Sequence, residues 1–147
     1  RMAPDIVKQA DIFVLHIAEV TGKAIKKQGM KKIALLGTRY VMEGDFYTQI
    51  LQEKFGLDVM IPDENERTFI HNTIFEELIK GVVSEASRAK FVAIINHLAS
   101  QGAEGIILGC TEIPLLIEQK HVSVPLFNTT NLHASAAVDL ALNESEN

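Results

Sequence analysis

Short apolar runs alternate along the chain with longer segments in which apolar residues recur at helical spacing. A short apolar run bounded by glycine or proline is typical of a buried strand, whereas recurrence every three or four residues predicts a helix. The predicted strands are residues 12–15, 32–36, 57–61, 106–108 and 121–127. The predicted helices are residues 5–10, 19–28, 42–55, 63–81, 84–102 and 129–142.

This alternation of strands and helices predicts the fold class. When helices connect successive strands, the strands lie parallel and the helices cover both faces of the sheet. We therefore expect an α/β chain with a doubly wound parallel sheet. The acidic residues 63–66 suit the first turn of a helix, and Thr129 or Thr130 is expected to cap the last helix.

The only cysteine, Cys110, follows the predicted strand 106–108. Open α/β sheets place their ligands at the carboxyl ends of the strands, and Pro114 suits the first turn of a following helix. The free amides of that helix would favour a thiolate, so we expect the pKa of Cys110 to lie below that of a free cysteine. A buried structural cysteine is the alternative, but Gly109 before it and Thr111-Glu112 after it argue against apolar packing.

A second strand end, Gly37-Thr38-Arg39, also offers polar groups directly after a glycine. Glycine lets the backbone approach a ligand closely, and hydroxyls and amides at both strand ends could hold a carboxylate. Cys110 could act as a nucleophile or as a proton carrier. His16 and His133 are conceivable partners for the thiol, with structural roles as the alternative.

Composition narrows the classes of function. The net charge of -5 gives no basic surface for nucleic acid, and no apolar run is long enough to predict a membrane span or signal peptide. One cysteine excludes an internal disulfide and fits a reducing, cytoplasmic environment. His71, His97 and His121 show no metal-ligand spacing. Because the chain of 147 residues begins with Arg1 rather than Met, we expect it to be processed or truncated.

Several motifs together resemble the aspartate/glutamate racemase family. The segment Gly109-Cys110-Thr111-Glu112-Ile113-Pro114 is similar to the signature of the second half of these enzymes. Further matching segments stand in the family's order and extend the resemblance over nearly the whole chain: residues 35–40, 42–43 with 45–47, 75–78, and 125–127 with 129–130.

The resemblance implies a mechanism without pyridoxal phosphate or any other cofactor. Family members invert an acidic amino acid with two cysteines, one removing the α-proton while the other delivers a proton to the opposite face. Cys110 matches the second-half cysteine. The first-half cysteine, in a Cys-Asn-Thr-like turn, has no counterpart here and would lie upstream of Arg1. We therefore expect the 147-residue chain alone to be inactive.

The resemblance also implies substrate-binding residues. Thr38 matches a strand-end threonine whose hydroxyl and neighbouring amides hold the substrate carboxylate, and Thr111 matches a residue that lines the site. Glu112 would orient the site or bind the substrate ammonium, unless it is only a helix-start carboxylate. Lys80 resembles a lysine that some members use for the side-chain carboxylate, although a lysine at a helix C-terminus is equally expected. Asn128 stands where many relatives have aspartate.

These expectations combine into one hypothesis: an α/β, flavodoxin-like parallel sheet that forms the second half of a pseudo-symmetric racemase. Residues 1–17 would end the first racemase domain, residues 18–117 would form the second, and residues 118–147 would return to the first. The substrate would be a small amino acid, with no nucleic-acid or membrane partner, and the full-length protein a homodimer. The alternatives are a cysteine-dependent isomerase or decarboxylase of dicarboxylates on this fold, and a degenerate carboxylate-binding domain.

Overall fold

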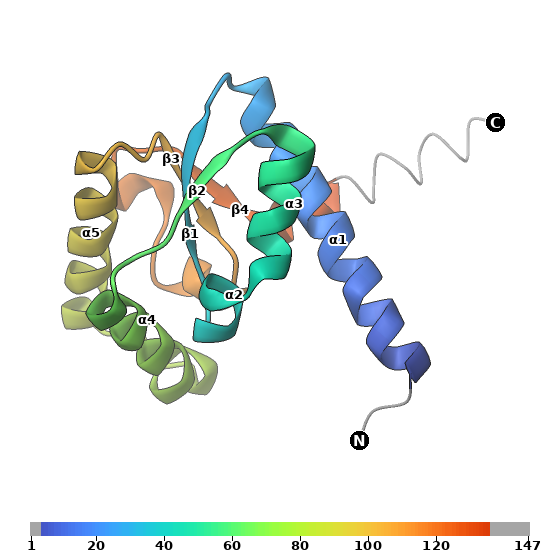
Figure 1. The fold of residues 1–147 in the computed structure, drawn as a ribbon. Coiled ribbons are helices and arrows are strands. Elements are labelled where there is room, and N and C mark those ends of the chain that lie inside the picture. The colour runs from blue at the N-terminus through green and yellow to red at the C-terminus, as the bar shows by residue number, and fades with distance from the viewer. Residues whose placement is uncertain (1–3, 136–147) are drawn as a thin grey trace.

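A four-stranded, all-parallel sheet forms the centre of the molecule in the computed structural model, which describes residues 4–135, with side chains from residue 12 onward. The strand order is β2-β1-β3-β4, so β1 and β3 are central. Helices lie on both sides of the sheet (Figure 1), which confirms the predicted doubly wound α/β architecture. The strands are β1 (Lys32–Leu36), β2 (Asp58–Met60), β3 (Gly105–Leu108) and β4 (Leu126–Asn128).

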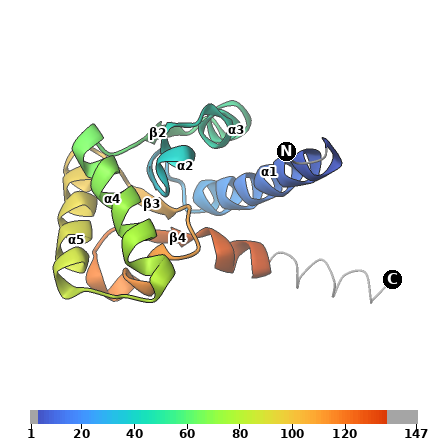
Figure 2. The ribbon, with the colours of Figure 1, turned by 90° about the horizontal axis from the view of Figure 1, so that it is seen from below.

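The helices form two layers. Helices α4 and α5 cover one face of the sheet, and α1 and α3 cover the other (Figure 2). Residues 129–135 are also helical. The α-helices are α1 (Pro4–Lys27), α2 (Arg39–Glu43), α3 (Asp45–Phe55), α4 (Glu64–Glu76) and α5 (Glu85–Ser100), and the short 3₁₀ turns are η1 (Leu78–Lys80), η2 (Ile113–Leu115) and η3 (Gln119–His121).

The two central strands are buried on both faces, which explains their unbroken apolar sequences. Alternate residues of a strand point to opposite faces, and β1 accordingly sends Ala34 and Leu36 toward α4 and α5 but Ile33 and Leu35 toward α1 and α3. The core is therefore two apolar layers separated by the sheet. The register fixes the ends of the strands, because Leu36 pairs with Leu108.

The strand predicted at residues 12–15 is wrong, because this segment lies inside the continuous helix α1. Val14 begins a stripe at helical spacing that continues through Ala18, Thr21 and Ile25, of which the last three are buried. The stripe packs α1 against α3 and the sheet. The apolar run looked like a strand because Ile12 and Phe13 are also apolar, although both are about half exposed.

Several predicted boundaries also shift. The helix predicted at residues 42–55 is split at Gly44, where a Cβ atom would lie 2.6 Å from the carbonyl oxygen of Tyr40. The last strand begins only at Leu126, because η3 ends at His121 and residues 122–125 form a loop before the strand. The predicted helix at residues 63–81 ends as α4 at Glu76 and continues as η1.

The final helix begins at residue 129, as predicted, but its cap differs. The Asn128 Oδ1 atom accepts a hydrogen bond of 3.2 Å from the Asn131 amide, so Asn128 rather than Thr129 or Thr130 occupies the capping position. The predicted end of this helix at residue 142 lies outside the described residues.

The predicted acidic start of α4 is confirmed as a capping box. The Asp63 carboxylate accepts from the Glu66 amide at 2.8 Å, and the Glu66 carboxylate accepts from the Asp63 amide at 2.9 Å. The amides of Asp63 and Glu66, two of the four that a helix N-terminus leaves unpaired, thus gain side-chain acceptors.

Replacing Asp63 with alanine should destabilise the full-length protein by about 1 kcal/mol, because the cap acceptor is lost. Asp63→Asn retains an acceptor at the same place and should lose less stability. Urea unfolding monitored by circular dichroism measures both differences. Equal stability of wild type and Asp63→Ala would show that the capping box contributes nothing.

Candidate active site at the carboxyl edge of the sheet

Three adjacent strands end at the same edge of the sheet and bring polar residues together. Thr38 follows β1 and Cys110 follows β3, each after one glycine, and Thr129 comes directly after β4. The Gly109 amide donates a hydrogen bond of 2.7 Å to the Leu36 carbonyl, so the two central strand ends are tied together. This edge matches the place where open parallel sheets bind ligands.

Glycine is required where these strand ends meet. A Cβ atom on Gly109 would lie 2.9 Å from the Leu36 carbonyl oxygen, which is backbone and cannot move aside cheaply. A Cβ atom on Gly37 would lie 3.0 Å from the Val41 side chain. Glycine is therefore needed before Cys110 because the backbone of β1 passes too close for a side chain, whereas a side chain before Thr38 would have to displace the Val41 side chain.

The thiol of Cys110 is paired with the carboxylate of Glu112. The Sγ atom donates to Oε2 at 2.9 Å. Burial raises the pKa of Cys110, and the hydrogen bond to Glu112 and its negative charge raise it further, to about 11. Cys110 is therefore a protonated thiol at neutral pH in this structure.

The expectation that Cys110 has a lowered pKa is wrong for the structure described. The segment after it forms the three-residue 3₁₀ turn η2, with Pro114 in its first turn, rather than an α-helix with an aligned dipole. Backbone amides of Glu112 and Ile113 do lower the pKa of Cys110, but burial and the carboxylate outweigh them. The effect of these amides on the thiol could be predicted from the sequence, but the burial of the Cys110 side chain could not.

Glu112 stays ionised beside this thiol. Hydrogen bonds from the Cys110 thiol and the Thr111 hydroxyl lower the pKa of its carboxyl. The Cys110 proton thus lies between the sulfur and an ionised carboxylate that accepts its hydrogen bond. Thr111 is exposed, and it shares with Gly109 the wall of a neighbouring pocket.

That pocket has a volume of about 280 Å³ and lies between α1 and the strand ends. Its polar lining comes from hydroxyl groups and one imidazole, and its apolar lining comes mainly from α1. The Thr129 hydroxyl donates to the Leu108 carbonyl at 3.0 Å and so holds the start of the last helix against β3. The lining residues are Phe13, Val14, Ile17, Val41, Tyr47, Gly109, Thr111, Thr129, Thr130 and His133.

Of the two candidate histidines, His133 lines this pocket and His16 does not. The His133 ring packs edge-on against Phe13 and His16, with ring centroids 5.0 Å apart in both cases. Its Nδ1 atom is buried without a hydrogen-bond partner among residues 12–135. Within the same residues, the side-chain partner of Cys110 is Glu112 rather than a histidine.

Thr38 is the N-cap of α2, and its hydroxyl accepts from the Val41 amide at 3.3 Å. The amide of Arg39, which the resemblance would place near a substrate carboxylate, donates instead to Nδ1 of His71 at 3.0 Å. The Arg39 guanidinium donates to the Glu43 carboxylate and to the Thr68 hydroxyl. His71 had no recognisable spacing motif in the sequence, and nothing local could have identified it.

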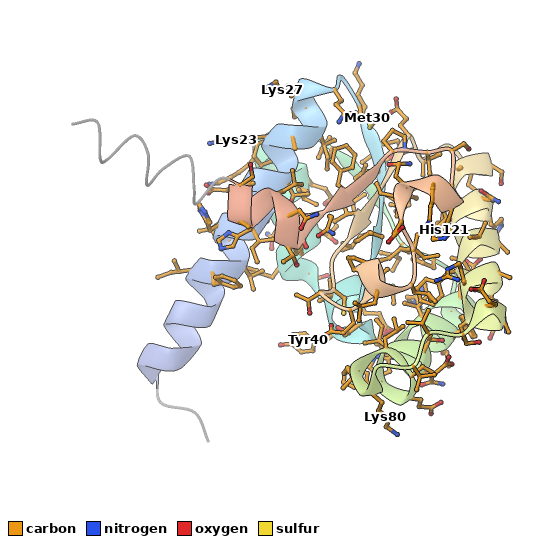
Figure 3. All side chains as sticks on the ribbon, turned by 180° about the vertical axis from the view of Figure 1, so that it is seen from behind. Lys23, Lys27, Met30, Tyr40, Lys80 and His121 are labelled. Atoms are coloured by element: carbon orange, nitrogen blue, oxygen red, sulfur yellow. The ribbon has the colours of Figure 1, made fainter. Side chains whose placement is uncertain are left out.

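Lys80 does not line the pocket. It is exposed in η1, and Figure 3 shows its side chain extending from the surface of the molecule. Asn128, which the resemblance places where many relatives have aspartate, uses Oδ1 for the helix cap. The described structure thus pairs Cys110 with Glu112, next to Thr111, and puts Thr38 at the adjacent strand end. Within residues 12–135, the Lys80 side chain makes no hydrogen bond or ion pair with any of these four residues.

One further group of metal-ligating side chains lies away from this edge. Ligand atoms of Asp63, Glu66 and His97 are within 4.8 Å of one another, but the carboxylates already serve the capping box and a 2.9 Å contact between Glu66 and His97. None of the described helices combines the length and the apolar character that crossing a membrane requires.

The fold and the strand-end cysteine define a parallel α/β domain with a candidate active site at its carboxyl edge. The sequence profile of the Asp/Glu/hydantoin racemase family matches residues 1–137. The chain belongs to this family, which confirms the resemblance found in the sequence.

Solved structures and a sequence relative agree with this placement. A candidate Asp/Glu racemase from Yersinia pestis is 52% identical with a TM-score of 0.84, over 87% of this chain and 56% of that one. An aspartate racemase homologue from Pyrococcus horikoshii OT3 is 39% identical with a TM-score of 0.78, over 85% and 54%. An uncharacterised protein in the pnlA 3′ region of Pectobacterium carotovorum subsp. carotovorum is 30% identical over 119 residues, 79% of this chain and 75% of that protein. The chain thus spans about half the length of the two solved structures.

Replacing Glu112 with glutamine should lower the pKa of Cys110 from about 11, because the charged acceptor that favours the thiol is removed. Burial remains, so part of the increase should persist. More thiolate at about pH 8 should then give faster alkylation by iodoacetamide than in wild type.

The rate of alkylation of Cys110 in the full-length protein as a function of pH, followed by mass spectrometry of the peptide that contains Cys110, measures this pKa in both proteins. Glu104→Gln, which changes a carboxylate bonded to the Lys31 and Lys32 amides at the opposite edge, is the matched control. An unchanged or higher pKa in Glu112→Gln would show that the carboxylate does not control the thiol.

Proposed function

We propose that the protein containing this chain racemises an acidic or related amino acid of the aspartate/glutamate type by a two-cysteine, two-base mechanism without pyridoxal phosphate. The observation that carries the proposal is the contact of 2.9 Å between the Cys110 thiol and the Glu112 carboxylate at the carboxyl edge of the sheet. Membership of the racemase family supports it, as does the described likeness to racemases.

Inverting a stereocentre needs an acid and a base on opposite sides of one carbon. In one direction, the thiol of Cys110 gives its proton to the α-carbon after the opposite base has removed the original proton. The thiolate that remains lies beside an ionised carboxylate, and this repulsion makes it a strong base. In the other direction, the Cys110 thiolate removes the α-proton, and the opposite thiol delivers one.

Glu112 acts on the proton of Cys110 in this scheme. Its carboxylate accepts the thiol hydrogen bond and stays ionised, so that its charge disfavours the thiolate and makes it a stronger base. Thr38 and Thr111 offer hydroxyl groups that can donate to a substrate carboxylate. Lys80 is proposed to bind the side-chain carboxylate of the substrate, as the family resemblance implies.

The second thiol is proposed to come from the part of the protein outside this chain. The chain covers 56% of the Yersinia pestis structure, so the whole protein is expected to be longer. We propose that residues 18–117 form the second domain and that residues 1–17 and 118–147 belong with the first. Helix α1 runs through the boundary at residue 17 without a break. Residues 1–147 alone should not racemise, since one face of the substrate would lack a proton carrier. A homodimer and a cytoplasmic location complete the proposal.

Cys110→Ala in the full-length protein should abolish racemisation of aspartate or glutamate, because one face of the α-carbon loses its acid and base. Cys110→Ser should lose at least about a hundredfold, since a hydroxyl is a much weaker acid and base than a thiol. Wild type should introduce solvent deuterium at the α-position during inversion, measured by proton NMR, with circular dichroism of the substrate reporting the inversion.

Ser123→Ala, at an exposed residue away from the strand ends, is the control and should retain wild-type rates. Full racemase activity in Cys110→Ala would contradict the two-thiol assignment. A wild-type protein that releases carbon dioxide from a dicarboxylate without racemising amino acids would favour the decarboxylase alternative. Binding without turnover would favour the carboxylate-binding alternative.

Lys80→Met should raise the KM for aspartate about tenfold if the ammonium binds the side-chain carboxylate, because a charge-assisted hydrogen bond is lost. Lys120→Met, which changes another exposed lysine, should leave KM unchanged. Initial rates over a range of aspartate concentrations give both values. An unchanged KM in Lys80→Met would show that Lys80 does not bind the substrate and is only a lysine at the end of η1.

A further inference from the structure

Helix α4 holds the strand-end turn of β1 by two hydrogen bonds to the same residue. The Arg39 backbone amide donates to Nδ1 of His71 at 3.0 Å, and the Arg39 guanidinium donates from Nη2 to the Thr68 hydroxyl at 2.6 Å. Thr68 and His71 are three residues apart and therefore lie on one face of α4. Both bonds join segments about thirty residues apart in the sequence.

The imidazole has a defined role in this contact. Because Nδ1 accepts the Arg39 amide proton, the neutral ring carries its own hydrogen on Nε2. The ring also packs against Phe75, with centroids 4.7 Å apart, one turn further along α4. His71 is thus fixed on both sides, by a ring contact within its helix and by a backbone amide of α2.

Helix α4 is a rigid support for this bond. Its buried residues Ile70 and Ile74 flank His71 and pack into the core with Met42 of α2. The capping box fixes the start of the same helix. The position of the Arg39 amide is therefore set by the core rather than by the exposed loop alone.

The amide that His71 binds belongs to the residue next to Thr38. The Thr38 hydroxyl accepts from Val41 at 3.3 Å and keeps its own hydrogen for another acceptor. Within residues 12–135, the first amide after Thr38 is thus occupied by His71, whereas the Thr38 hydroxyl still has a hydrogen to donate outward. Moving the Arg39 amide would move the Thr38 hydroxyl, because the two are consecutive.

We propose that His71 is a positioning residue, which holds the Thr38 turn by accepting the Arg39 amide so that the Thr38 hydroxyl meets a substrate carboxylate. This inference rests on the proposed function, in which Thr38 binds that carboxylate. His71 itself does not touch the substrate. It acts through the backbone of Arg39.

The test uses His71→Ala and His71→Asn in the full-length protein. Alanine removes the acceptor, whereas the Oδ1 atom of asparagine can occupy nearly the same place as Nδ1 and accept the same amide. Asn72→Ala changes the exposed neighbouring residue on α4 and is the control. Three measurements are made: hydrogen exchange of the Arg39 amide by NMR, KM and kcat for aspartate, and protection of Cys110 from iodoacetamide by aspartate.

His71→Ala should speed exchange of the Arg39 amide by about tenfold or more, because its hydrogen bond is lost. KM should rise about fivefold with little change in kcat, since a contact made in both ground and transition states is weakened. The aspartate concentration that protects Cys110 should rise by the same factor. His71→Asn should restore all three toward wild type, and Asn72→Ala should match wild type.

The proposal is overturned if His71→Ala keeps the wild-type KM and protection, or if His71→Asn is as impaired as His71→Ala. It is also overturned if His71→Ala lowers kcat with KM unchanged. A wild-type protein that does not racemise refutes the proposed function instead. Amide exchange and protection by aspartate still decide the role of His71 in that case, because neither measurement needs turnover.

Discussion

The hydrogen bond between the Gly109 amide and the Leu36 carbonyl is the contact on which the candidate site depends. The Gly109 nitrogen lies 2.7 Å from the Leu36 oxygen, so the bond holds the ends of the two central strands together. Only glycine fits at residue 109, because a Cβ atom would clash with that carbonyl oxygen. Thr38 and Cys110 follow these two ends. Their proximity is thus a consequence of backbone packing, before either side chain makes a contact.

The environment of Cys110 sets two opposing effects. With a pKa of about 11, only about one molecule in ten thousand carries the thiolate at pH 7. The same increase makes each thiolate a stronger base, which helps it to remove a weakly acidic α-proton. The adjacent carboxylate of Glu112 causes part of this increase and is also the nearest acceptor for the thiol proton. One pair of side chains therefore lowers the population of the base and raises its strength.

The strands and helices near the core could be predicted because the spacing of apolar residues within each segment indicates which side chains are buried. Lys32–Leu36 and α5 follow from apolar runs and periodicity, and Cys110 follows from its place after β3. The segment 12–15 could not be assigned correctly from its own residues. Its helical character shows only when it is taken together with Thr21 and Ile25, which continue the buried stripe further along α1. His71 could not be predicted either, because its bond depends on how α4 packs beside α2.

The wall of the pocket beside Cys110 shows why such long-range packing matters for chemistry. Phe13, Val14 and Ile17 come from α1, whereas Thr129 and His133 come from the other end of the described chain. The Thr129 hydroxyl is committed to the Leu108 carbonyl, so the last helix is fixed to the same strand that carries Cys110. Cys110 itself packs against the apolar layer on the other face of the sheet, which α4 and α5 cover. The pairing of Cys110 with Glu112 is local in sequence, but the burial that raises the pKa of the thiol comes from packing around it that its neighbours in the sequence do not specify.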